Sequence, residues 1–450
     1  MTLPRYSDAR SMSERIVMEC TLVLDEPAHL GGADPDATSD RPLLRNADGR
    51  IYLAGTALKG VLRARSSLEA LFGSTTRQAR LLVDDAPLVD TVATQVRDGV
   101  AISPELGIAE HSRKYDFEVL PAGARFSARF EAVVDLEPQR FLRELCAALE
   151  VLSSGVEIGA RTRRGFGRLR RDGPWRVRRH AGAPGLRAWL FDGCSGAPPS
   201  WQTGDTQHDD LATLLGVASV HLQSRSETTI RLDLKVDGSL LIRAPVAGSG
   251  PADHAQLHAQ WADGSLHPVI TGTSLAGVFR SRCTRIARTL LEGAGNELID
   301  GLFGPRTIRD GNTRASRLRF NEAKICGSTT LRHTRVRIDP WTGGASDALL
   351  FTSEPTYGGQ VTPEIRWSRP TDERRERAER ALLLLALRDL VLGDLHVGGE
   401  SAAGRGRLAP LHADGRFGYF GDQELRLTST GGLAGDFRDD LHALQEWGHD

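Results

Sequence analysis

The stretch Gly55-Thr56-Ala57-Leu58-Lys59-Gly60-Val61-Leu62-Arg63-Ala64-Arg65 recurs later in the chain as Gly272-Thr273-Ser274-Leu275-Ala276-Gly277-Val278-Phe279-Arg280-Ser281-Arg282. Two further blocks recur in the same order: residues 104–123 match 340–359, and residues 158–169 match 397–408. The blocks lie farther apart in the second copy, which places its extra residues in loops. The chain is therefore a tandem repeat, and each repeat is long enough to be a whole domain.

The composition is that of a soluble globular protein. The chain has 450 residues, of which 40% are apolar and 26% charged, enough for two ordinary cores. No apolar run reaches membrane-spanning length, and residues 1–10 lack the zones of a secretory signal, so we expect a cytoplasmic protein without a membrane partner. The cysteines have no Cys-x-x-Cys spacing, which predicts reduced, partly buried thiols; they are Cys20, Cys146, Cys194, Cys283 and Cys326.

Charge is unevenly distributed along the chain. The formal net charge is only −1, but residues 161–180 carry a basic strip with the single acid Asp172. A concentrated basic strip can hold phosphates on a nearly neutral protein. Its members are Arg161, Arg163, Arg164, Arg168, Arg170, Arg171, Arg176, Arg178 and Arg179.

Hydrophobic periodicity gives both repeats the same order of elements. Alternating apolar residues predict first strands at 16–24 and 230–236, and another strand at 126–134. Apolar residues from Leu58 to Leu71 have the spacing of a core-facing helix, for which Thr56, and Thr273 in the second copy, are the expected N-caps. Further helices are expected at 139–152 and 372–392, and helix stops at Gly73 and Gly304.

This order predicts an α+β protein of two tandem ferredoxin-like βαββαβ domains, each with an inserted β region. We expect the first domain at residues 1–180 and the second at 226–412. Residues 181–225 are interrupted by Gly and Pro and are expected to be a linker containing a short helix near 209–215. Residues 413–450 are expected to form a C-terminal tail.

The Gly-Thr turns are candidate phosphate sites. Lys59 falls in a first helical turn, where a cation opposes the macrodipole and backbone N–H groups lack partners, so a bound anion would relieve both costs. Arg63 lies one turn further along. An ordinary capped helix with a solvated basic face is the alternative, but recurrence as Gly272, Thr273 and Arg280 favours phosphate. The order Gly-Lys-Ser/Thr of a nucleotide-binding loop is absent, so no ATPase is indicated.

Gly-rich turns precede the last strand of each repeat. The first contains Gly159, Gly165 and Gly167 beside the cations Arg161, Arg163 and Arg164, and the second contains Gly398, Gly404 and Gly406. Glycine permits positive φ and close backbone approach, which suits a phosphate backbone. A plain hairpin or bulge is the alternative explanation.

The loop 25–50 is too long and polar for a mere connection, and holds Asp34, Asp36, Asp40 and Asp48. A carboxylate beside a phosphate groove makes sense if it binds Mg²⁺ or accepts a proton. A solvated acidic loop explains the spacing equally well. His254 and His258 have a helical metal-site spacing, but no third ligand accompanies them, so we discount a metal there.

Several of these motifs resemble the RAMP-superfamily backbone subunits of type III CRISPR effector complexes. They are Asp40-Arg41-Pro42-Leu43-Leu44, Asp48-Gly49, the Gly55-Thr56-x-Leu58-Lys59-Gly60 turn with Arg63, residues 335–345 with Glu354, and the Gly-rich loops. The resemblance spans about residues 12–172 and 226–410.

The resemblance implies two modified RNA-recognition-motif domains, each with a β-hairpin thumb, at 98–123 and 334–359. It also implies binding of guide RNA (crRNA) and target RNA, and assembly with other CRISPR effector subunits, including a large polymerase-like subunit. Asp40 matches the aspartate needed for Mg²⁺- or Mn²⁺-dependent target cleavage, in which a ribose 2′-OH attacks the adjacent phosphate.

The second repeat departs from the pattern. Asp40 stands fifteen residues before Gly55, and the residue fifteen before Gly272 is Leu257. Asp253 can take the catalytic place only if this loop is realigned. Two alternatives to a target-cleaving subunit stay open: an inert guide-binding scaffold, and a metal-independent endoribonuclease that processes precursor crRNA. The second would use a histidine base, and no histidine recurs at matching positions.

Overall fold

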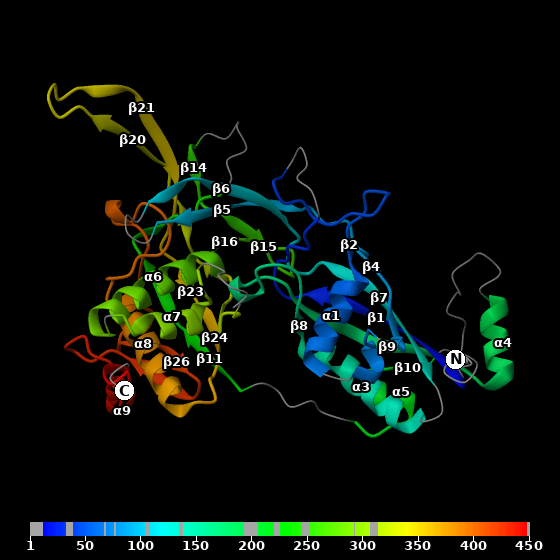
Figure 1. Cartoon of the computed structure of the whole chain (residues 1–450). Coiled ribbons are helices and arrows are strands. Elements are labelled where there is room, and N and C mark those ends of the chain that lie inside the picture. The colour runs from blue at the N-terminus through cyan, green and yellow to red at the C-terminus, as the bar shows by residue number, and fades with distance from the viewer. Residues whose placement is uncertain are drawn as a thin grey trace, which may run out of the picture. The chain divides into compact units, whose positions relative to one another are not determined.

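The computed structural model describes residues 12–32, 39–66, 69–75, 78–103, 108–134, 138–192, 206–219, 226–244, 252–291, 293–306 and 314–447 (Figure 1). Asp34, Asp36, Cys194 and residues 104–107 lie outside this part. The chain divides into two compact units. The first comprises Met1–Gln95, Glu118–Ala160 and Gly167–Gln223, and the second comprises Val96–Phe117, Arg161–Phe166 and Ser224–Asp450.

The first unit is an antiparallel sheet covered by helices. Its strand order is β10-β9-β1-β7-β3, and β8 also pairs with β9. The strands are β1 (Glu14–Leu24), β3 (Leu81–Val83), β7 (Arg125–Val134), β8 (Val156–Glu157), β9 (Arg168–Ala181) and β10 (Thr206–His208); the short β2 (Tyr52–Leu53) and β4 (Ala86–Pro87) pair separately. The helices are α1 (Gly55–Ser66), α2 (Glu69–Phe72), α3 (Pro138–Ser154), α4 (Gly182–Asp192) and α5 (Leu211–Leu215).

The second unit repeats this order. Its main sheet runs β17-β24-β11-β26-β27, so its strands β26-β11-β24-β17 correspond to β9-β1-β7-β3. These strands are β11 (Glu227–Leu232), β17 (Leu318–Phe320), β24 (Glu364–Ser368), β26 (Arg416–Phe420) and β27 (Gln423–Arg426). The helices α6 (Gly272–Leu291) and α7 (Gly295–Phe303) follow the first strand, α8 (Glu373–Val391) follows the third, and α9 (Arg438–Gln445) lies near the C-terminus.

A second sheet in this unit has the order β15-β16-β18-β23-β12-β25. It consists of β12 (Leu234–Asp237), β15 (His258–Gln260), β16 (Leu266–Ile270), β18 (Ala323–Cys326), β23 (Gln360–Val361) and β25 (Arg407–Pro410). The strand expected at 230–236 is therefore divided at Asp233 between two sheets. The remaining pairings join β13 (Ser239–Leu240), β19 (Thr329–Thr330) and β22 (Thr356–Tyr357) in one ladder, and β14 (His254–Ala255) with β21 (Ala345–Glu354) in another.

Each repeat carries a two-stranded hairpin. The first is β5 (Gln95–Ile102) with β6 (Ala109–Val119), and the second is β20 (His333–Ile338) with β21 (Ala345–Glu354). Figure 1 shows the second hairpin extending away from α6, α7 and α8 of its unit. Most residues of the first hairpin cluster with the second unit, as does the short turn Arg161–Phe166.

The apolar stripe read from the sequence is the core-facing side of both repeated helices. Leu58 and Leu62 are fully buried in the first core, and Leu275 and Phe279 in the second, because residues three or four apart share one helix face. The helix stops are confirmed: α2 and α7 end just before Gly73 and Gly304, each with φ +77°.

Two expected boundaries differ from the structure. Residues 181–225 contain the short helix α5 near its expected place, but also α4, and β10 pairs with β9 in the main sheet of the first unit. Residues beyond 412 contribute β26, which pairs with β11, to the second sheet. Gly and Pro content marked residues 181–225 as a linker, whereas the pairing of β10 and of β26 includes parts of both segments in the sheets.

Candidate nucleic-acid interface

At the start of α1, the backbone at Gly55 lies very close to the backbone of Val83 and Asp84. A β-carbon on Gly55 would lie 2.3 Å from the carbonyl oxygen of Val83, so only glycine fits. The N–H of Gly55 donates to the Asp85 carboxylate at 2.8 Å, which satisfies one open group of the first helical turn. Thr56 is exposed within this turn.

The entrance to α6 is built in the same way. A β-carbon on Gly272 would lie 2.1 Å from the carbonyl oxygen of Phe320 and 2.4 Å from that of Arg164. The hydroxyl of Thr271 accepts from the N–H of Ser274 at 3.2 Å and from the hydroxyl of Thr273 at 3.0 Å. Thr271 is thus the N-cap.

The prediction that Thr56 and Thr273 are N-caps was wrong, because α1 begins at Gly55 and α6 at Gly272, one residue before each expected cap. The threonines belong to the first turn instead. In the first repeat the cap position is Ala54, which has no polar side chain, and Asp85 takes over the role.

One face of α1 is cationic. Thr56, Lys59 and Arg63 follow one another at three- and four-residue spacing, with Thr56 and Arg63 exposed and Lys59 half-buried. Burial, and then the neighbouring Arg63, lower the pKa of Lys59. Repulsion between two cations on one helix face is relieved by a bound anion, so this face suits a phosphate.

A second group of cations surrounds Arg280 and is called here the Arg280 cluster: Arg164, Arg280 and Arg306. Burial, and then the charges of Arg306 and Arg164, lower the pKa of Arg280. Asp300 lies 3.6 Å from Arg280 as a partial counter-charge, and Nη1 of Arg280 donates to the carbonyl of Phe303 at 3.4 Å. The buried Nε of Arg280 has no hydrogen-bond partner within the described structure. The cluster is an under-neutralised cationic site.

Sequence reasoning found Arg164 and Arg280 and missed Arg306. Arg306 follows the helix stop Gly304 and Pro305, outside the repeated blocks. The signal in the sequence was its position just beyond the helix stop Gly304. Because α6 and α7 pack together, a cation at the end of α7 can lie near Arg280 of α6.

The Gly-rich turns make close contacts with protein backbone rather than open surface, with one exception. An added β-carbon would lie 2.7 Å from the backbone N of Glu322 at Gly165, 1.9 Å from the carbonyl of Ile158 at Gly167, and 2.2 Å from that of Val397 at Gly406. At Gly404 it would meet no described atom within 4 Å. The first three glycines are thus explained by chain packing alone.

The arginines of the first Gly-rich turn have different surroundings. Arg161 adopts φ +62°, and its guanidinium lies 3.8 Å from the ring centre of Phe117 and donates to the hydroxyl of Tyr115. It joins the turn to the first hairpin. Arg163 is half-buried in the same turn, whereas Arg164 is exposed.

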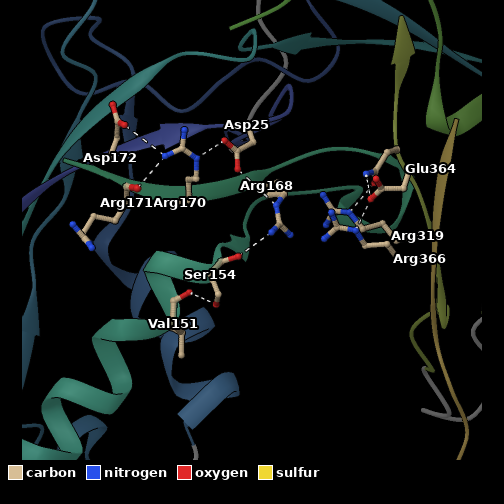
Figure 2. A network of polar contacts seen from close by, with 11 residues as sticks. Asp25, Val151, Ser154, Arg168, Arg170, Arg171, Asp172, Arg319, Glu364 and Arg366 are labelled. Carbon is tan, nitrogen blue, oxygen red and sulfur yellow. Dashed lines mark hydrogen bonds and ion pairs between the residues drawn. The ribbon is translucent and has the colours of Figure 1, made fainter. Parts of the chain in front are cut away.

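The rest of the basic strip lies on β9, where acids pair with Arg168, Arg170 and Arg179. Figure 2 shows Arg170 between Asp25 and Asp172, at 2.8 and 3.5 Å, while Arg168 reaches the carbonyl of Ser154 at 2.8 Å. Arg179 pairs with Glu14 at 2.5 Å. The strip read as one basic surface is therefore divided, because acids distant in sequence lie beside it.

Figure 2 also shows a polar network in the second unit. Arg366 donates to Glu364 at 2.9 Å, and Asn321, beside the buried Arg319, donates to the same carboxylate at 3.3 Å. These groups stabilise the edge of the sheet on which β17 pairs with β24.

Asp40 is exposed at the start of a loop that Glu118 anchors. The backbone N–H of Glu118 donates to the carbonyl of Arg41 at 3.0 Å, and its carboxylate accepts from the N–H of Leu43 at 3.0 Å and from Arg45 at 2.6 Å. Glu118 itself is 6% exposed. A buried carboxylate at the base of the first hairpin thus fixes the loop that carries Asp40.

Asp253 occupies the matching place in the second unit. In the first unit, Leu44 N–H donates to Leu30 and Gly32 N–H to Pro42. In the second, Leu257 N–H donates to Ile242 and Ala244 N–H to Ala255. Each aspartate stands two residues before the accepting Pro42 or Ala255. The ladder register therefore aligns Asp40 with Asp253. The second repeat has four more residues between this position and its helix entrance, because Asp40 precedes Gly55 by fifteen residues and Asp253 precedes Gly272 by nineteen.

The two aspartates have different surroundings. The carboxylate of Asp253, which is exposed, accepts from the N–H of Thr352 at 2.7 Å, and its own N–H donates to the Thr352 carbonyl at 2.9 Å. Asp253 is thereby fixed to the second hairpin, whereas Asp40 follows the buried Ser39, whose hydroxyl accepts from Arg41 N–H at 3.1 Å.

Metal-binding and reactive side chains are sparse in the described ranges. His254 and His258 lie on β14 and β15, not on one helix face. Among described residues no three His, Cys, Asp or Glu side chains group as a metal site. Cys20, Cys146 and Cys283 are buried, and burial raises the pKa of each thiol, that of Cys146 to about 12. They are structural rather than reactive.

The family model of the RAMP superfamily matches residues 21–170 and 245–409. The chain belongs to the RAMP superfamily. Both matched segments contain a Gly-Thr helix entrance, a hairpin and a Gly-rich turn, so membership covers both repeats and supports a CRISPR-associated, RNA-binding role. No curated protein matches the chain. In the part of the chain that the structure describes, no helix is long and apolar enough to span a membrane.

Proposed function

We propose that this chain is a backbone subunit of a type III CRISPR ribonucleoprotein. Its two repeats bind guide RNA, and the first repeat cleaves complementary target RNA with Mg²⁺ or Mn²⁺. The strand orders β9-β1-β7-β3 and β26-β11-β24-β17, each with helices after the first and third strands, support two ferredoxin-like cores. The two hairpins are the proposed thumbs.

The observation that carries this proposal is the pair of cationic helix entrances. Thr56, Lys59 and Arg63 line one, and the Arg280 cluster adjoins the other. Phosphates are the anions that such surfaces bind in nucleic acids, and arginine contacts to them are indifferent to sequence. Specificity would then come from base pairing with the guide. A large polymerase-like subunit and other effector subunits are the proposed partners.

Asp40 is the proposed catalytic group. Mg²⁺ is commonly bound by one or two carboxylates together with phosphate oxygens, so a single exposed aspartate beside RNA fits that ion. The bound ion would stabilise negative charge at the phosphate. Asp40 would hold it or take the proton of the ribose 2′-OH. The 2′-oxygen would then bond to phosphorus while the bond to the 5′-oxygen breaks, and the departing 5′-oxygen would take a proton from water, leaving a 2′,3′-cyclic phosphate and a 5′-hydroxyl.

The test is target cleavage by the guide-loaded complex carrying Asp40→Ala, with Asp48→Ala as the matched control. Both aspartates are exposed in the same loop. A lost base typically costs about 100-fold or more in rate, so Asp40→Ala should lose cleavage at the first-repeat position while guide binding is kept. Asp48→Ala and the unaltered complex should cut alike, and EDTA should stop both. Unchanged cutting by Asp40→Ala would leave only the scaffold function.

A further inference from the structure

The base of the second hairpin is fixed by a reciprocal contact with Asp253. The N–H of Asp253 donates to the carbonyl of Thr352 at 2.9 Å, and the carboxylate of Asp253 accepts from the N–H of Thr352 at 2.7 Å. Both backbone groups of Thr352 are thus bonded to one residue. Because backbone groups along a strand edge need partners, Asp253 continues the pairing at the point where β21 leaves β14.

The Gly-rich turn of the second repeat holds the same hairpin. Arg405 is 1% exposed, and its guanidinium donates to the hydroxyl of the buried Ser353 at 3.2 Å and to the carboxylate of Glu400 at 2.9 Å. Glu400 also accepts from Arg335 of β20 at 3.0 Å. A buried guanidinium needs such acceptors, so this network fixes both strands of the hairpin near Thr352.

The first repeat joins its loop to its hairpin through a different carboxylate. Glu118 of β6 accepts from Arg45 of the facing loop at 2.6 Å. Glu354 has the matching place in the repeated blocks, but it pairs with Arg332, just before β20, at 2.6 Å. In the second repeat, the side-chain contact between loop and hairpin is therefore made by Asp253, from the loop.

Asp253 is also separated from its helix entrance by more structure than Asp40 is. The segment between Asp253 and Gly272 is four residues longer than that between Asp40 and Gly55, and it forms β15 and β16. These strands pair with each other, and β16 pairs with β18 in the second sheet. A catalytic carboxylate must lie within hydrogen-bond reach of the reacting group, whereas Asp253 is bonded to a hairpin.

We propose that Asp253 is a positioning residue of hairpin β20–β21 and not a catalytic group. Its carboxylate acts through the backbone of Thr352 and sets the direction in which the hairpin leaves β14. The chain then cuts target RNA once, at the first repeat, although both repeats bind the guide. The hairpin contact needs no RNA, whereas the single cut rests on the proposed function.

Hydrogen–deuterium exchange of the full chain without RNA, read residue by residue, tests the contact. Asp253→Ala should speed exchange of the Thr352 N–H about fivefold, because one hydrogen bond is lost. Asp253→Asn should restore the protection, because its amide oxygen can accept the bond. Asp263→Ala is the matched control: Asp263 is also exposed and accepts from the N–H of Ser265 at 2.9 Å, and its loss should leave Thr352 unchanged. Unchanged exchange in Asp253→Ala, or equal acceleration in Asp253→Asn, would overturn the positioning role.

The products of target cleavage by the guide-loaded complex test the single cut. The unaltered complex and Asp253→Asn should give the same single cut, and Asp40→Ala should give none. A second cut in the unaltered complex would overturn the single-cut claim, and its loss in Asp253→Asn would make Asp253 catalytic; either result would leave cleavage at the first repeat standing. No cut in the unaltered complex would instead refute the proposed function, and the exchange result would still decide the role of Asp253.

Discussion

Removing the cations of α1 should reduce the salt dependence of guide-RNA binding by a calculable amount. The candidate interface contains five cations: Lys59, Arg63, Arg164, Arg280 and Arg306. Each phosphate neutralised on a single strand contributes about −0.7 to the slope of log affinity against log salt, which gives about −3.5. Between 50 and 200 mM salt the affinity should thus fall about 100-fold. Without Lys59 and Arg63 the slope should be about −2.1 and the fall about 20-fold.

The assay is fluorescence anisotropy of labelled guide RNA over a salt series, with Lys59→Ala/Arg63→Ala compared to Arg140→Ala/Arg377→Ala. The control removes the same charge from exposed positions of α3 and α8, where each arginine pairs with a glutamate four residues away. Its slope should match that of the unaltered chain. If the α1 variant keeps the full slope and affinity, these cations do not contact phosphate and the reasoning is refuted.

Three further predictions concern stability. Arg97→Ala leaves Glu322 buried without its partner and should lower the free energy of unfolding in urea by about 3–5 kcal/mol. Lys114→Ala breaks an exposed pair with Asp98 and should lower it by at most about 1 kcal/mol. Equal losses in the two variants would contradict a stabilising buried pair. Because the pKa of Cys146 is raised from 9.0 to about 12, its stability contribution should be full below pH 9 and be lost as pH rises towards 12; Cys146→Ala should flatten that decline, and an unchanged pH profile would count against it. Asp253→Ala should lower the free energy of unfolding by about 1 kcal/mol, because the hydrogen bond from the N–H of Thr352 is lost. Asp253→Asn should lower it less, because the amide oxygen can still accept this bond. Equal losses in the two variants would show that the bond contributes nothing to stability.

The sequence predicted the elements whose cause is local. Residue spacing placed β1, β7, α3 and α8 closely, and glycine marked the ends of α2 and α7. The repeated Gly-Thr block located the two helix entrances. At each one a neighbouring backbone segment lies too close for a β-carbon, so both copies have glycine at this position.

Features that depend on distant contacts were not predictable from the sequence. Asp25 and Glu14 neutralise arginines of β9 far along the chain, and the count of local charge could not include them. The alignment of Asp40 with Asp253 likewise could not be read from the sequence. It rests on the backbone hydrogen bonds that the carbonyls of Pro42 and Ala255 accept. The cap at Thr271 was missed because the helix begins one residue before the expected cap.

Cleavage by iron-EDTA tethered to the two helix entrances tests the central claim most directly. Gly60 and Gly277 hold the same position in the repeated block and have open space around them, so Gly60→Cys and Gly277→Cys can carry the probe. Each variant, loaded with end-labelled guide RNA, should cut the guide in one narrow cluster, the two clusters lying at different, fixed positions along one strand. Unmodified chain treated identically should not cut. Absence of cuts from either site, or cuts spread evenly along the RNA, would contradict guide binding at the two entrances.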